Sequence, residues 1–187
     1  MFERVSIRLV LSIMMAAAMI SVSANAQGYH QNSLTLSVGA YAASGFGTNP
    51  YAGVRYNYIL PDDRFFVEGS IGFSSLKSDV LETISRSQVF PSNDLYTYEF
   101  VLAYDAHPTG YVPYILAGVA GINQGGQTSF AGVLGLGKRM PLANFLGSDQ
   151  LGLRYDIRDQ VFSQQINNAD PFLAHNITFT LGLQFYF

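Results

Sequence analysis

The last twelve residues of the sequence alternate between apolar and mostly polar side chains. Successive side chains of a β-strand point to opposite faces, so residues 176–187 predict a strand with one apolar and one polar face. The apolar face consists of Ile177, Phe179, Leu181, Leu183, Phe185 and Phe187. Such a strand, ending on an aromatic residue, is typical of the closing strand of a membrane barrel, whose outer face meets lipid.

The first 26 residues predict a secretory signal peptide. Arg4 and Arg8 precede an apolar run from Leu9 to Ile20, and Ala24-Asn25-Ala26 supplies a small-residue cleavage pattern. The run is too short for a convincing membrane-spanning helix, although an uncleaved N-terminal anchor is the alternative. Because no Cys lies near the cleavage point, a lipoprotein anchor is excluded. We therefore expect the mature chain to begin near Gln27 and residues 27–187 to form a single domain.

The composition favours strands that meet lipid on one side. Charged residues make up 12% of the chain and Phe, Tyr and Trp together 14%, whereas soluble proteins average ~25% charged residues. Cys is absent, so no disulfides hold the chain together outside the cytoplasm. The net charge of −3 gives no electrostatic signature of nucleic-acid binding.

Eight segments of the mature chain have the period of a strand. The faces of the fifth and sixth cannot be assigned, because apolar residues occupy both. The segments are 34–42, 51–60, 65–74, 96–105, 111–122, 129–138, 151–158 and 176–187. Their number and length predict an all-β fold, an eight-stranded antiparallel up-and-down transmembrane β-barrel.

The connections differ in length, as they do in outer-membrane barrels. The turns at 61–64 and 105–110 are short and are assigned to the periplasmic side. The connections 44–50, 76–95, 121–128 and 159–174 then face outward, while 139–150 is longer than expected for a periplasmic turn. Val80, Leu81, Ile84 and Val89 lie near helical spacing. They predict either a short helix that binds a partner over the barrel mouth or a self-packed loop.

The sequence resembles small bacterial outer-membrane barrels of the OmpA-transmembrane, OmpX and OmpW kind. The resemblance rests on the signal peptide, the eight strands, the ending Leu183-Gln184-Phe185-Tyr186-Phe187 and the segment 153–159. It implies a location in the outer membrane of a Gram-negative bacterium, contact with outer-membrane lipids, and a barrel-assembly machinery that reads Phe187. An OmpA-like peptidoglycan-binding domain is not expected. The alternative is a soluble lipocalin-like barrel, which would turn its apolar faces inward.

Strand counting places six charged side chains on the inward faces. They are three bases and three acids: Arg55, Arg154, Arg158, Glu68, Glu99 and Asp156. The interior of an eight-stranded barrel is just wide enough for side chains to fill, and buried charges are costly unless paired. We therefore predict an ion-pair network that plugs the lumen. The alternative interpretation is a narrow or gated ion path lined by the same residues.

The sequence gives little support for catalysis, and we expect no catalytic residues, no cofactor and no metal site. Ser163, Asp170 and His175 can be imagined as a triad, but lipid A deacylases carry a His and a Ser two residues apart, and His175 lacks that Ser. The pairs Asp62-Asp63 and Asp105-x-His107 are better explained as turn formers than as metal ligands. The leading hypothesis is a non-enzymatic scaffold with extracellular loops for an unknown partner. A narrow channel comes second and a lipid A-modifying enzyme third.

Overall fold

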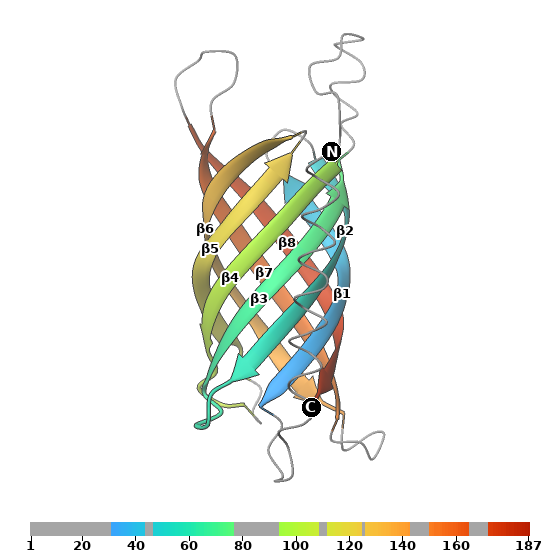
Figure 1. Cartoon of the computed structure of the whole chain (residues 1–187), viewed down its shortest axis with the longest axis vertical. Coiled ribbons are helices and arrows are strands. Elements are labelled where there is room, and N and C mark those ends of the chain that lie inside the picture. Colours follow the sequence, from blue (N-terminus) through green and yellow to red (C-terminus); the bar gives the residue numbers. More distant parts are fainter. Residues whose placement is uncertain are drawn as a thin grey trace.

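The computed structural model describes residues 31–43, 47–76, 94–108, 112–124, 126–142, 150–164 and 172–187. The predicted signal peptide and the candidate helix around residues 80–89 lie outside these ranges. Eight strands follow one another along the chain (Figure 1): β1 Asn32–Ala43, β2 Gly47–Ile59, β3 Phe65–Ser75, β4 Asp94–Tyr104, β5 Tyr114–Gln124, β6 Gln127–Pro141, β7 Leu151–Gln164 and β8 Phe172–Tyr186. None of the described segments is a helix long and apolar enough to cross a membrane.

The strands form a closed barrel, which confirms the predicted fold class. Each strand pairs antiparallel with its neighbours in the chain, and β1 closes the ring by pairing with β8. The stagger of the barrel is found by stepping from each residue to its paired residue in the next strand. Starting at Asn32 of β1, one circuit of the barrel returns to β1 at Ala42, ten residues from the start. This stagger tilts the strands, by ~35–45° in barrels of this kind.

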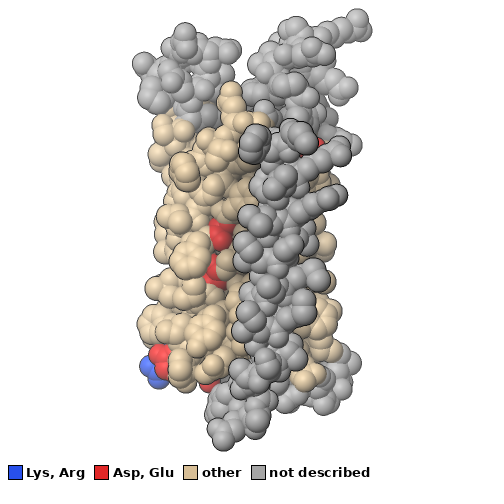
Figure 2. All heavy atoms as spheres, viewed as in Figure 1, with Lys and Arg blue, Asp and Glu red and all other residues tan. Residues whose placement is uncertain are grey.

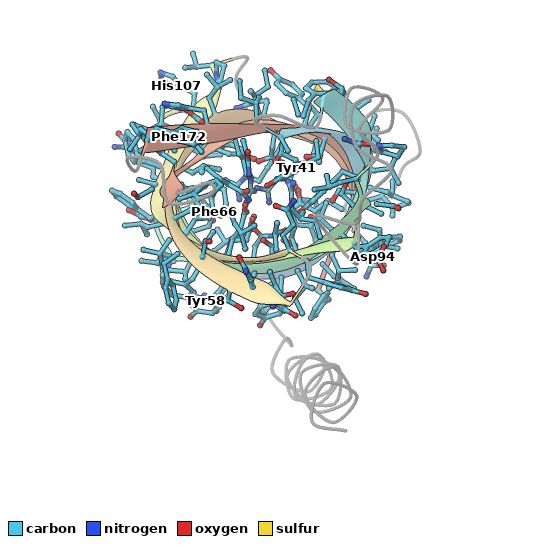
Figure 3. All side chains as sticks on the ribbon, turned by 90° about the horizontal axis from the view of Figure 1, so that it is seen from above. Tyr41, Tyr58, Phe66, Asp94, His107 and Phe172 are labelled. Carbon is cyan, nitrogen blue, oxygen red and sulfur yellow. The ribbon has the colours of Figure 1, made fainter. Side chains whose placement is uncertain are left out.

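Alternate side chains point into the lumen and away from the barrel (Figure 3). Tyr41 and Phe66 lie inside, whereas Tyr58 and Phe172 point outward. The alternation also shows which residues of β5 and β6 point inward, which could not be assigned from the sequence. In β5 the buried side chains are Tyr114, Leu116, Ala120 and Ile122, and in β6 they include Ala131 and Val133. Their neighbours Ile115, Val119, Leu134 and Leu136 are exposed on the outer surface.

Several predicted connections are shorter than expected: 44–50 is reduced to 44–46 and 121–128 to 125–126. β7 continues to Gln164 and β8 begins at Phe172, so most of the predicted loop 159–174 is strand. The extension was hidden because the polar residues Asp159 and His175 occupy outward positions. β6 likewise runs to Pro141, and Leu142 N–H donates to Leu151 O at 2.8 Å. The connection between β6 and β7 therefore spans residues 142–150, fewer than predicted.

The connections 60–64, 105–113 and 142–150 lie at one end of the barrel, called the lower end here because it lies at the bottom of Figure 1. The two shortest connections, 44–46 and 125–126, lie at the opposite end, contrary to the predicted asymmetry in length. β1 begins and β8 ends at this end. In the turn between β2 and β3, Asp62 Oδ1 accepts from the backbone N–H groups of Arg64 and Phe65 at 3.3 and 3.4 Å. Asp62 thus acts as a turn former, as predicted. Phe187 joins the barrel seam through backbone hydrogen bonds with Asn32 at 2.9 and 3.2 Å.

Candidate functional site in the barrel lumen

The structure brings all six predicted interior charges together at mid-height in the lumen. Each of the six residues is at most 7% exposed. Arg154 lies 2.7 Å from Glu68 and 2.9 Å from Asp156, and Arg158 lies 2.6 Å from Glu68 and 3.2 Å from Asp156. Arg55 pairs with Asp156, and Arg158 also pairs with Glu99. Every charge of this mid-lumen network therefore has at least one partner of opposite sign.

Four strands supply the mid-lumen network. Arg154, Asp156 and Arg158 are alternate residues of β7, so they share one inward face. The other members come from β2, β3 and β4, as Arg55, Glu68 and Glu99. None of these three strands is bonded to β7 in the sheet, so the ion pairs cross the lumen. This is possible because eight strands enclose a space no wider than facing side chains can fill.

Uncharged side chains form further hydrogen bonds with the charged groups of the network. Arg154 Nη1 donates to Asn57 Oδ1 at 2.9 Å, and Arg55 Nη2 donates to Thr180 Oγ1 at 2.7 Å. Glu99 accepts from Gln160 Nε2 at 2.6 Å and from Ser70 Oγ at 3.2 Å. Buried ion pairs contribute stability only when such additional hydrogen bonds complete them. The network is therefore hydrogen-bonded to its uncharged neighbours as well as ion-paired.

A second polar layer lies above the mid-lumen network. Tyr41 donates to Gln160 Oε1 at 2.8 Å and accepts from Asn176 Nδ2 at the same distance. The Tyr41 ring stacks on Tyr51, with ring centroids 5.9 Å apart. Sequence reasoning missed this layer because Gln160 lies in the segment 159–174 assigned to a loop, although Asn176 was assigned to the last strand. Extending the alternation of Arg154, Asp156 and Arg158 by two residues would have found Gln160.

Apolar side chains are buried above this layer. Those buried near the upper ends of the strands include Ala43, Leu76, Leu95, Ile122, Ala131, Phe162 and Ala174. Residues of this kind provide no ligands for a permeating ion. The described part of the upper end therefore contains more buried apolar side chains than the charged middle, with Asn49 and Ser74 as buried polar residues.

The lower end of the lumen holds a separate charged group, which we call the lower cluster: Asp105, Lys138, Arg139 and Phe66. Asp105 lies 3.4 Å from Lys138 and 3.2 Å from Arg139. Arg139 sits over the Phe66 ring, 4.5 Å from its centroid. Sequence reasoning missed this cluster: it assigned Asp105 only to a turn, and it placed Lys138 in a strand whose faces could not be assigned and Arg139 in a connection.

The imagined catalytic triad is not assembled within the described residues. Ser163 is exposed on the outer face of β7, and Asp170 lies outside the described ranges. His175 Nδ1 instead lies 2.8 Å from Asp159 Oδ2 in an exposed pair on the outer surface. In the described part of the chain no three His, Cys, Asp or Glu residues gather as they would around a metal ion.

Comparisons with family models and with curated proteins find no match for this chain. Among solved structures, the chain is similar to the N-terminal β-barrel domain of Pseudomonas aeruginosa OprF, with 17% sequence identity and a TM-score of 0.48. The similarity covers 84% of this chain and 98% of that domain.

Proposed function

We propose that this chain is an integral outer-membrane barrel with a plugged lumen, which serves as a non-enzymatic scaffold. The support for a membrane location is the outer surface. Large apolar side chains are exposed on all eight strands, among them Val38, Tyr58, Phe73, Phe100, Val119, Leu134, Ile157 and Leu181. A soluble barrel would not present such a continuous apolar surface to water.

The distribution of aromatic residues also supports a membrane location. On the face shown in Figure 2, Lys and Arg are visible among the described residues only at the lower end, whereas Asp and Glu are also visible at mid-height. Aromatic pairs lie near both ends of this wall: Phe65 with Tyr104 toward the lower end, 4.9 Å between ring centroids, and Phe73 with Tyr96 toward the upper end, 5.3 Å apart. Aromatic girdles flank the apolar band of membrane barrels at both interfaces.

The observation that carries the plugged-scaffold proposal is the mid-lumen network. Ion pairs connect β7 with β2, β3 and β4 across the lumen, and a hydrogen bond from Arg55 to Thr180 connects β2 with β8. Water and ions find no continuous path through such packing. Because nothing passes through a plugged lumen, we assign the scaffold role to the connections at the upper end. We orient these connections toward the outside of the cell, where they would bind a partner. Their partner is unidentified.

Location is tested by expressing the full chain and separating membrane and soluble fractions. We expect extraction only with detergent, together with a gel mobility that changes on heating. A detergent-free monomer in the periplasmic extract would contradict the proposal and favour a soluble barrel.

Conductance in planar bilayers tests the plug. The native protein is expected to show no steady channels. Glu99→Ala removes the carboxylate that accepts from Arg158 and Gln160 and is expected to produce leak currents. Phe100→Ala is the matched control, since Phe100 is the next residue in β4 and points outward. Steady, selective channels from the native protein would overturn the plug and support the channel alternative.

A further inference from the structure

The charged side chains buried in the lumen and at its lower end do not balance. Among the described residues, five bases and four acids are buried: Arg55, Lys138, Arg139, Arg154 and Arg158 against Glu68, Glu99, Asp105 and Asp156. The mid-lumen network contains three of each sign and is neutral. The excess positive charge therefore belongs to the lower cluster, where Asp105 is shared by Lys138 and Arg139.

The contacts of the lower cluster are also looser than those of the mid-lumen network. Asp105 lies more than 3 Å from both cations, whereas Glu68 lies 2.6 and 2.7 Å from Arg158 and Arg154. The other acceptors of the two bases are neutral carbonyls. Lys138 Nζ donates to His107 O at 2.7 Å and Arg139 Nη2 to Asp63 O at 3.4 Å. These carbonyls solvate the cations but do not neutralise them.

Among the described residues, Asp105 is the carboxylate that forms ion pairs with Lys138 and Arg139, although Asp62, Asp63 and the Phe187 carboxylate also lie at this end. The Asp62 carboxylate accepts backbone N–H groups of its own turn. Asp63 contacts Arg139 through its backbone oxygen, and Arg64 and His107 are exposed at the same end. Arg154 lies 5.4 Å from the centroid of the same Phe66 ring that Arg139 contacts, which places a further cation nearby. A buried positive charge without a counter-charge costs several kcal/mol.

We propose that Lys138 and Arg139 form an anion site at the lower mouth of the lumen, which holds a small inorganic anion such as chloride or phosphate. Arg139 offers planar donors whose direction is fixed by packing on Phe66, and Lys138 supplies a compact ammonium. Within the described residues these two bases share the single acid Asp105, and the bound anion supplies a second negative charge. In the proposed membrane orientation the anion enters from the periplasmic side, but the site itself depends only on the lower cluster.

The direct test is the line width of ³⁵Cl in NMR spectra of chloride solutions containing the full chain folded in detergent micelles. Chloride that exchanges with a protein site gives a broader line. We expect excess broadening with the native protein and its displacement by inorganic phosphate. Absence of excess broadening would overturn the proposal, including the case in which another carboxylate of this chain fills the site.

Three variants assign the broadening to the lower cluster. Lys138→Met removes the excess positive charge and is expected to abolish the excess broadening. Asp105→Asn leaves two cations without an acid, so chloride should bind more tightly, by roughly tenfold or more for an added unit of charge at short range. Arg64→Met removes an exposed base at the same end and should change nothing. Equal broadening in all variants would show nonspecific association. If Lys138→Met does not fold, unchanged chloride affinity in Asp105→Asn contradicts the proposal by itself.

Discussion

Arg154 donates from Nε and Nη2 to the two carboxylate oxygens of Asp156, each at 2.9 Å, although the two residues are only two positions apart in β7. Such two-point contacts fix the guanidinium plane. Asp156 also accepts from Tyr114 and pairs with Arg55 and Arg158. One carboxylate therefore joins all three arginines of the mid-lumen network.

Asp156→Asn is expected to destabilise the barrel by ~3–5 kcal/mol, the usual cost of removing one partner from a buried ion pair. Three arginines would then share two acids. Asp159→Asn is the control, because Asp159 lies in the same strand but forms an exposed pair with His175, which is worth at most ~1 kcal/mol. Unfolding in urea, measured in lipid vesicles, compares the two. Equal effects would show that Asp156 is not the centre of the network.

The mid-lumen network and the lower cluster differ in how far the sequence could predict them. In β7, Gly152, Arg154, Asp156 and Arg158 alternate with Leu151, Leu153, Tyr155 and Ile157, so the polar face is visible in the sequence. In β6, Lys138 follows the outward positions of Leu134 and Leu136, yet it is buried, because its long chain reaches His107 O. Strand period alone cannot place a flexible side chain at the end of a strand.

The cross-lumen partners were beyond the reach of the sequence for a different reason. Alternation gives the facing of Glu68 and Glu99, but their pairing with Arg158 depends on the stagger of all eight strands around the ring. The same applies to Tyr41, which meets Gln160 from a distant strand. The closed topology followed from the strand count, whereas the register required the structure.

Neighbouring side chains of β8 point to opposite faces of the barrel wall, so they should accept different substitutions. Leu181 is 55% exposed on the outer surface, and Thr180 is 1% exposed next to Arg55. Leu181→Phe should therefore be accepted, while Leu181→Arg should cost ~2–4 kcal/mol near the bilayer midplane. Thr180→Phe should be rejected, because it adds volume to a filled lumen. Folding titrations in vesicles measure all three, and tolerance of Thr180→Phe would mean that the lumen is not packed.

Two glycines of β5 provide a test of packing between adjacent strands. A Cβ at Gly118 would collide with Phe100 O and lie 2.6 Å from Val101 Cα, whereas a Cβ at Gly121 would meet no atom within 4 Å. Gly118→Ala is expected to cost at least ~1–3 kcal/mol, since backbone atoms would have to move. Gly121→Ala should be neutral or stabilise by up to ~1 kcal/mol. The unfolding midpoints of the two variants measure these effects. If Gly121→Ala were the more destabilising of the two, the inward and outward faces of β5 would have been assigned the wrong way round.

Phe187 can act through its backbone or through its side chain, and two variants separate these roles. Its backbone forms two hydrogen bonds with Asn32 at the barrel seam, which Phe187→Ala keeps and deletion of Phe187 removes. If an assembly machinery reads the aromatic ring, as we propose, both variants should lower the amount inserted in cells. Refolding of purified protein into vesicles, where no machinery is present, should then be impaired mainly by the deletion. Normal insertion of Phe187→Ala in cells would assign the residue to seam closure alone.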